Sequence, residues 1–193
     1  MKKSLGAGTF ACPCPVWCIG TYDAEGRPNM MAAAWVGICC SRPPSITVSL
    51  RDATYSYRSI IESEAFTVNI PSESQAREAD FWGIVSGKNR NKFLESGLTP
   101  VKAEKVNAPF VAEFPLVLEC VLRQSHKIGL HTQFIGEILD VKAEEEVLNE
   151  RGVPDMSRIR PFLYSPAERT YYGAGQTLGR AYDLGMDLAE KNK

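Results

Sequence analysis

The sequence predicts a mainly β protein, a small antiparallel barrel that carries a few helices. Short apolar stretches recur along the chain, and turn-forming residues separate them. In one of these stretches Ile46, Val48 and Leu50 alternate with polar neighbours, which is the period of a half-buried strand. Helix-length crossovers between the predicted strands are missing, so a doubly wound parallel sheet is not expected.

The first third of the chain is expected to be rich in strands. Apolar runs predict the strands, and polar or proline-containing segments predict the turns between them. The expected elements are an antiparallel hairpin made of residues 16–22 and 29–40 around a turn at 23–28, a break at 42–44, the alternating strand around residues 46–50, a short helix at 54–63 and a strand at 66–70.

The rest of the chain mixes short helices, loops and two further strands. Ser72 and Gln75 have the spacing of a capping box, which predicts a polar helix that runs to about Phe81. The later elements are a polar loop at 86–92, strands at 116–122 and 132–141, a connecting segment at 123–131 that carries both histidines, a polar loop at 151–160 and a roughly helical stretch at 171–188 that four glycines weaken.

Length and charge narrow the class of protein. The chain has 193 residues, which favours a single domain over residues 1–193. Its 22 basic and 23 acidic side chains give a net charge of −1, so no nucleic acid or membrane partner is expected. Residues 30–40 form the longest apolar run, far short of the ~20 residues of a membrane helix. No apolar region follows the two lysines at the N-terminus, so a cytoplasmic protein is expected.

Six cysteines are present, and reduced thiols are the expected state in the cytoplasm. Cys12, Cys14 and Cys18 lie close together in a proline-rich segment, which leaves a metal or redox role open. The C-x-C spacing does not suit structural zinc and no second pair of ligands is evident, so a structural or incidental role is favoured and no metal site is assigned.

Several common catalytic patterns are absent from the sequence. There is no G-x-S-x-G elbow, no H-E-x-x-H motif and no phosphate-binding P-loop. The glycines at 173, 175 and 179 do not have the spacing of a dinucleotide-binding fold. A Cys120–His131 nucleophile pair stays open, although a lone buried cysteine is usually only a small apolar residue.

Residues 49–56 carry the chemistry of a phosphate site. They run from a strand end into a predicted helix start, where backbone N–H groups face outward. Arg51 adds a forked donor, and Lys92 in a later loop could add a second positive charge. Hydroxyl donors come from Ser49, Thr54 and Ser56. The alternative is a capped helix with solvated charges, and composition alone favours it.

The run from Asn29 to Gly37 is more unusual. Ala32, Ala33 and Ala34 would leave volume unfilled in the core of a sheet. A flat ligand could fill that volume and approach the backbone closely, with Trp35 as a wall. The alternative is an ordinary strand packed against large neighbours, and the residues alone do not decide between the two.

The sequence resembles the flavin reductase-like proteins that bind FMN in a split β-barrel, most closely their flavoredoxin branch. The similarity runs over nearly the whole chain and rests on the order and spacing of several short motifs. They are Asn29-Met30-Met31-Ala32-Ala33-Ala34-Trp35-Val36-Gly37, Pro44-Ser45-Ile46-Thr47-Val48-Ser49-Leu50-Arg51, Phe66-Thr67-Val68-Asn69-Ile70-Pro71, Ser86-Gly87 with Lys92-Phe93, His131-Thr132-Gln133-Phe134-Ile135-Gly136-Glu137, and Tyr171-Tyr172 with Leu178-Gly179.

The resemblance implies an antiparallel Greek-key split β-barrel with a few peripheral helices, a homodimer, and FMN near the subunit interface. Residues 29–35 would lie along the flavin ring, and residues 49–56 would hold the phosphate. Lys92, His131 and Tyr164 would stand near the ring or phosphate, and Ser56 replaces a frequent threonine. The implied cofactor-binding residues are Asn29, Met30, Met31, Ala32, Ala33, Ala34, Trp35, Ser49, Leu50, Arg51, Thr54, Ser56, Lys92, His131 and Tyr164.

The implied function is an FMN-binding oxidoreductase that passes hydride or electrons from NAD(P)H through the flavin to an acceptor. The cofactor carries the difficult chemistry, so no catalytic acid or base is assigned. Two alternatives stay open. One is an FMN electron carrier that does not oxidise NAD(P)H itself, and the other is a thiol or metal protein centred on Cys12, Cys14 and Cys18.

Overall fold

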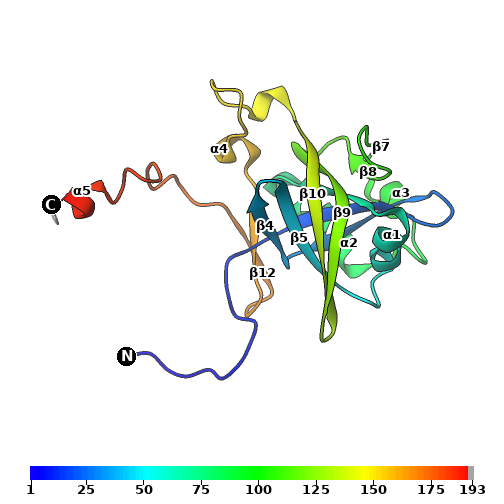
Figure 1. The fold of residues 1–193 in the computed structure, drawn as a ribbon, viewed down its shortest axis with the longest axis horizontal. Coiled ribbons are helices and arrows are strands. Elements are labelled where there is room, and N and C mark those ends of the chain that lie inside the picture. Colours follow the sequence, from blue (N-terminus) through cyan, green and yellow to red (C-terminus); the bar gives the residue numbers. More distant parts are fainter. Residues whose placement is uncertain (191–193) are drawn as a thin grey trace.

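The structure, a computed structural model, describes residues 1–190 and confirms a mainly β fold with few helices (Figure 1). Its largest sheet has seven strands, and all its neighbouring strands are antiparallel. In spatial order they are β3 (Pro28–Ala33), β2 (Trp17–Tyr22), β6 (Ala65–Ile70), β9 (Leu116–Ile128), β10 (His131–Ala143), β5 (Pro44–Arg51) and β4 (Val36–Ser41).

Two smaller sheets and several short helices complete the fold, and α2 and α3 pack beside β3. The smaller sheets contain β1 (Cys14–Pro15), β11 (Phe162–Ser165) and β12 (Thr170–Gly173), and β7 (Pro100–Lys102) with β8 (Pro109–Val111). The helices are α1 (Tyr55–Ser63), α2 (Ala76–Ile84), α3 (Lys92–Ser96), α4 (Met156–Ile159), α5 (Met186–Glu190), η1 (Glu73–Gln75) and η2 (Glu145–Val147).

The core consists of two clusters of buried side chains. The larger one fills the barrel, where Ile19, Phe66 and Phe134 are fully buried. Strand β6 is buried along its whole length, because strands flank it on both sides and the core covers it. The second cluster lies between the sheet and helices α2 and α3, and the rings of Trp82 and Phe93 pack there at a tilt of 56°, with centroids 5.5 Å apart.

The apolar run at 29–40 forms two strands, although the sequence predicts one. The chain bends at Ala34 and Trp35, so that β3 pairs with β2 while β4 pairs with β5 at the other end of the sheet order. The predicted hairpin is therefore confirmed for β2 and β3 only. Apolar periodicity cannot locate the bend, because both strands on either side of it are apolar.

The β9–β10 hairpin is much longer than predicted. It extends the expected strands at 116–122 and 132–141 to 13 residues each. The added residues 123–128 are mostly polar because this end of the hairpin is exposed, and exposure removes the apolar signal. His126 therefore lies within β9, and His131 begins β10.

The predicted helix at 171–188 is wrong. Tyr171 belongs to β12, and its ring centroid lies 5.4 Å from that of Phe162 and 5.6 Å from that of Tyr164. Pairing with β11 stabilises this strand, whereas the glycines of the segment disfavour a helix. Residues 174–180 are irregular, and α5 is only five residues long. The structure also contains α3, α4, β7, β8 and β11, which the sequence does not predict. Residues 191–193 of the expected domain lie outside the described residues.

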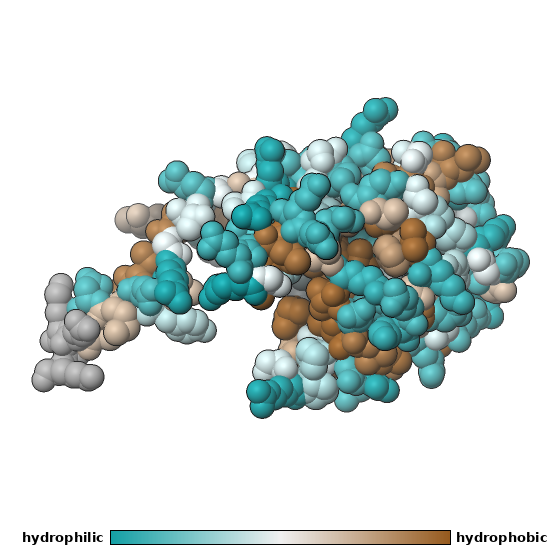
Figure 2. All heavy atoms as spheres, turned by 90° about the horizontal axis from the view of Figure 1, so that it is seen from above, coloured by the Kyte–Doolittle hydropathy of each residue, from teal (hydrophilic) through white to brown (hydrophobic). Residues whose placement is uncertain are grey.

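Both terminal segments leave the barrel on the same side (Figure 1). The C-terminal arm, residues 174–190, exposes apolar side chains that include Leu178, Tyr182 and Leu184. Figure 2 shows brown, apolar atoms along this arm and in a patch on the body of the molecule. No helix in residues 1–190 is long and apolar enough to cross a membrane.

We expect Gly20→Ala to destabilise the fold. An added Cβ would lie 2.2 Å from the Pro109 carbonyl oxygen and 2.3 Å from Thr67 Oγ1, and backbone cannot move away cheaply. The free energy of unfolding should fall by about 1–3 kcal/mol in urea titrations. Gly37→Ala is the matched control, because Gly37 also lies in a strand but has open space around it, and its change should stay within about 0.5 kcal/mol. Equal effects of the two substitutions would contradict this packing.

Candidate functional site

A crevice runs along the exposed side of β3, from the start of α1 to the bend before β4. It consists of two adjoining hollows of about 200 and 220 Å³ that share Met31, Ala32 and Thr54. Ligand pockets commonly have about 300–1,000 Å³, so the joined crevice has the size of a cofactor site although neither of its two hollows does alone. Its other lining residues are Asn29, Ala33, Ala34, Trp35, Ser49, Leu50, Arg51, Ala53, Tyr55, Ser56, Trp82, Gly83, Ile84, Val85, Ser86, Gly87, Lys92 and His131.

Small side chains form one wall of this crevice. Ala32, Ala33 and Ala34 are half-buried, all three line the second hollow, and Trp35 at their end is 39% exposed. The Ser49 N–H donates to the Trp35 carbonyl oxygen at 2.9 Å, which holds the bend against β5. A flat molecule could therefore lie against the backbone of this segment.

The other wall is the junction between β5 and α1, which offers several donors. Arg51 is exposed and has no ion pair or hydrogen bond from its guanidinium to any described residue. Thr54 occupies the N-cap position just before α1, yet its hydroxyl donates to the Arg51 carbonyl oxygen at 2.8 Å and does not cap the helix. The N–H groups of Tyr55 and Ser56 consequently stay available at the start of a nine-residue helix, an arrangement that suits an anion.

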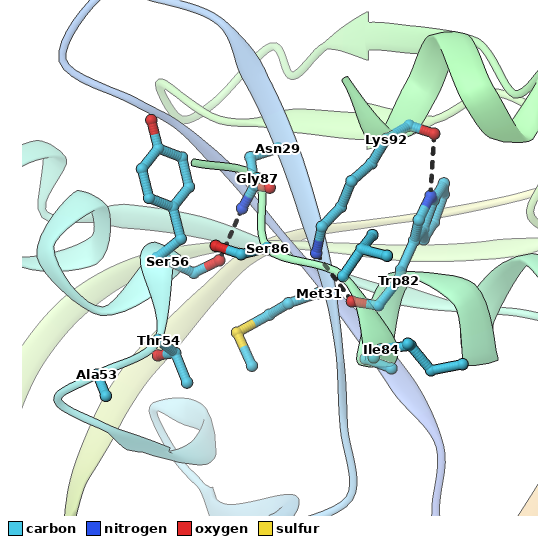
Figure 3. A pocket seen from close by; sticks show the side chains of 14 residues that line it. Asn29, Met31, Ala53, Thr54, Ser56, Trp82, Ile84, Ser86, Gly87 and Lys92 are labelled. Atoms are coloured by element: carbon cyan, nitrogen blue, oxygen red, sulfur yellow. Dashed lines mark hydrogen bonds between the residues drawn. The ribbon is translucent and has the colours of Figure 1, made fainter. Parts of the chain in front are cut away.

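A buried amide and a hydroxyl lie between the two walls (Figure 3). Asn29 Nδ2 donates to Ser56 Oγ at 2.9 Å, while Asn29 Oδ1 is buried and has no hydrogen-bond partner among the described residues. Gly87 packs directly against this amide, because a Cβ there would lie 2.0 Å from Asn29 Oδ1. Buried polar atoms are normally hydrogen-bonded, so this amide is poised to take a partner from a ligand.

Lys92 lies at the back of the crevice (Figure 3). It begins α3 and is 4% exposed, and its ammonium donates to the carbonyl oxygens of Met30 at 2.7 Å and Trp82 at 2.8 Å. Burial lowers the pKa of Lys92 from 10.5 to about 8, and the neighbouring Cys18 acts in the opposite direction. The residue therefore holds β3 to α2 and places a positive charge behind the crevice.

The structure brings together most of the residues that the sequence analysis singles out. His131 pairs in register with Arg51 across β10 and β5, so both reach the same hollow as Trp35. The side chains of Met30 and Leu50 point into the core. Tyr164 lines neither hollow of the crevice, since it lies on β11 beside Tyr171. His126 is exposed on β9, as expected for a histidine without a ligand role.

The sequence analysis misses one whole side of the crevice. Residues 82–87, at the end of α2 and in the loop after it, line the first hollow together with Ala53 and Tyr55. A signal for this side exists in Gly87, which allows close approach of the backbone to Asn29. Glycine alone is a weak signal, because it is also common in loops that bind nothing.

The structure does not bring the N-terminal cysteines together as a three-ligand metal site. Cys18 is fully buried in the second core cluster, and burial raises the pKa of its thiol, whereas Cys12 is exposed. Within residues 1–190 no group of three or more His, Cys, Asp or Glu side chains could hold a metal ion. The metal alternative therefore lacks structural support.

Comparison with known proteins identifies relatives of this fold. The model of the flavin reductase like domain family matches residues 9–173. A flavoredoxin structure from Desulfovibrio vulgaris (Miyazaki F) is 54% identical, with a TM-score of 0.92 over 96% of this chain and 100% of that chain. A flavoredoxin structure from Methanosarcina acetivorans is 29% identical, with a TM-score of 0.87 over 97% of this chain and 98% of that chain.

Curated relatives are more distant. A ferric-chelate reductase (NAD(P)H) of Archaeoglobus fulgidus is 27% identical over 67% of this chain and 78% of its own length. Two further relatives, from Archaeoglobus fulgidus and Aeropyrum pernix, are 33% and 30% identical. The matched region spans 65% and 54% of their respective lengths.

We expect the buried ammonium of Lys92 to give a distinctive pH dependence of stability. Between pH 8 and about 10.4 the unfolded chain holds this proton and the folded chain has lost it, so the lysine's contribution to stability rises with pH. The buried thiols of Cys18 and Cys120 have raised pKa values and act in the opposite direction, so a difference measurement is needed.

The measurement compares wild type with Lys92→Met by urea unfolding at pH 7, 8, 9 and 10. The free energy of unfolding of wild type, minus that of the variant, should be flat below pH 8 and then rise by about 1 kcal/mol per pH unit. A difference that does not change with pH would show that Lys92 keeps an ordinary pKa.

Proposed function

This chain belongs to the flavin reductase-like domain family, and on that premise we propose that it is an FMN-binding oxidoreductase. It would pass hydride or electrons from NAD(P)H through the flavin to an acceptor. The observation that carries the proposal is a crevice with an alanine wall on one side and, on the other, the unpartnered guanidinium of Arg51 beside the start of α1. FMN has this same division into a flat ring and a phosphate.

The phosphate end of the cofactor fits the junction of β5 and α1. Arg51 would give a charge-assisted hydrogen bond, and the N–H groups of Tyr55 and Ser56 would add backbone donors. The unpartnered Asn29 Oδ1 is an acceptor, so it would take a hydrogen bond from a hydroxyl of the ribityl chain and not from the phosphate. No carboxylate lines either hollow, so nothing in the described crevice repels a phosphate dianion.

The ring end of the cofactor fits the wall from Met31 to Trp35. Small side chains there would let the ring approach the strand backbone, and Trp35 and His131 would border its open face. Lys92 lies behind β3, and its charge would favour negative charge on a reduced ring through space without requiring a direct contact. Tyr164 would act near the ring from β11, where it pairs with Cys14 of β1.

FMN would supply the redox chemistry, accepting hydride from a nicotinamide and releasing electrons one or two at a time. The protein would bind the phosphate, orient the ring and leave one face open beside Trp35 and His131. No residue is assigned as a catalytic acid or base. The flavoredoxins and the ferric-chelate reductase (NAD(P)H) among the relatives support the proposal of a flavin-dependent oxidoreductase.

We further propose that residues 1–193 form one domain of a cytoplasmic homodimer. The exposed apolar side chains of the C-terminal arm, such as Tyr182 and Leu184, support an intersubunit contact. The partner molecules would be NAD(P)H and an electron acceptor, with no nucleic acid or membrane involved.

The proposal is tested by the absorbance spectrum of the purified protein, identification of the released chromophore, and anaerobic addition of NADH or NADPH. We expect bound FMN and its reduction by at least one of the two nicotinamides. Bound FMN that neither nicotinamide reduces would point to an electron carrier. A protein that binds no flavin when FMN is added would overturn the proposal.

Arg51→Ala should weaken FMN binding by about 1–3 kcal/mol, or roughly 5- to 150-fold, because a charge-assisted hydrogen bond to phosphate is lost. Fluorescence titration of apoprotein with FMN measures the change. Arg58→Ala is the matched control, since Arg58 lies on the exposed side of α1 in an ion pair with Glu62 and lines neither hollow of the crevice. Equal FMN affinities of the two variants would show that Arg51 does not bind the phosphate.

A further inference from the structure

A third hollow, of about 530 Å³, adjoins the ring end of the crevice. It shares Ala34, Trp35 and Ser49 with the crevice, so the two hollows adjoin at this segment. Cys12 and Cys14 both line it, and the function proposed above uses neither of them. The rest of its lining is Thr9, Ala11, Pro13, Pro15, Val36, Gly37, Thr47 and Pro166.

The two thiols are held at this place by a short strand. Cys14 begins β1 and pairs in register with Tyr164 on β11, the aromatic residue expected near the flavin. Its thiol donates to the Ala11 carbonyl oxygen at 3.3 Å. Cys12 is exposed and Cys14 is half-buried, so both thiols are accessible from the hollow.

The spacing of Cys12 and Cys14 allows a bond between them. A chain spans at most about 7 Å over two residues, and disulfides form at Cα separations of about 4.4–6.8 Å. The other cysteines are differently placed. Cys18 and Cys120 are buried, and Cys39 and Cys40 are exposed on β4 but line neither the crevice nor this hollow. Exposed disulfides are the ones that are readily reduced and re-formed.

We propose that Cys12 and Cys14 form a dithiol–disulfide couple that exchanges electrons with the flavin in the adjoining crevice. The acceptor class is then a small organic disulfide. The proposal rests on the proposed function, because the flavin is the source of the electrons. No charged side chain lines the hollow, which suits an uncharged disulfide better than an ionic acceptor.

The reaction is balanced in two halves. The thiolate of the more exposed Cys12 attacks one sulfur of the external disulfide, RSSR, and one RS⁻ leaves. The Cys14 thiolate then attacks the Cys12 sulfur, which forms the Cys12–Cys14 bond and releases the second RS⁻. In the reductive half, that bond takes up two electrons and two protons and becomes two thiols, while the reduced flavin that supplies them returns to its oxidised form.

The first experiment examines the thiols of the apoprotein with bis(2-hydroxyethyl) disulfide as the probe. After alkylation of free thiols, the peptide 1–25, which a glutamate-specific protease releases by cleavage after Glu25, should lack two hydrogen atoms, with a link between Cys12 and Cys14 and an alkylated Cys18. Cys14→Ser should instead keep the probe as a mixed disulfide on Cys12. The double variant Cys39→Ser/Cys40→Ser is the control and should form the link as wild type does. Absence of the link, or a link to Cys18, would overturn the proposal.

The second experiment tests the electron path. Holoprotein that carries the link is photoreduced anaerobically with EDTA, so that electrons enter through the flavin. It should take up about twice as many electrons per flavin as Cys12→Ser/Cys14→Ser, and both thiols should reappear. Apoprotein under the same light should keep the link. Equal uptake by wild type and variant, with the link intact beside a reduced flavin, would refute the couple.

The two proposals fail in distinguishable ways. A protein that binds no FMN overturns the proposed function and this inference with it. A protein that binds FMN and becomes reduced, but leaves the Cys12–Cys14 link unreduced, overturns only the thiol couple.

Discussion

The site depends on one buried cation. The ammonium of Lys92 donates to the carbonyl oxygens of Met30 on β3 and Trp82 on α2. It thereby fixes the distance between β3, which forms one wall of the crevice, and α2, which leads into the opposite side. Removing a lysine from water is costly, and burial lowers its pKa accordingly. A fold that keeps such a group needs it for position or charge. Lys92 provides both position and charge, because the ammonium that joins β3 to α2 also lies directly behind the alanine wall.

The electrostatics of the crevice follow from where the acidic groups are held. Asp52 lies next to Arg51 in sequence, yet it pairs with Lys127, which leaves the arginine without a partner. Asp23 is likewise bound to Arg27 and Tyr55, and these contacts outweigh its desolvation and lower the pKa of its carboxyl group. The lining of the crevice therefore offers donors and positive charge without a neutralising carboxylate. This arrangement suits a ligand that carries a phosphate and gains negative charge on reduction.

The bend at Ala34 and Trp35 links the crevice to the larger hollow beyond it. Because β3 and β4 diverge there, the backbone of this segment has a hollow on both sides, and Trp35 borders each of them. A cofactor ring on one side and an acceptor on the other would be separated only by short side chains and an indole. The thiols of Cys12 and Cys14 lie in the larger hollow, on the acceptor side of Trp35.

The sequence by itself determined what depends on local pattern. The alternation of Ile46, Val48 and Leu50 predicted β5, the Ser72–Gln75 capping box and the start of α1 are present, and the alanine run and Arg51 marked two sides of one crevice. Only the tertiary structure decided what depends on contacts between distant segments. The division of residues 29–40 into two strands, the course of the chain after Tyr171, the side of the crevice formed by residues 82–87, and the burial of Lys92 all result from packing. A local pattern cannot encode these features, because the free energy that selects them comes from partners tens of residues away.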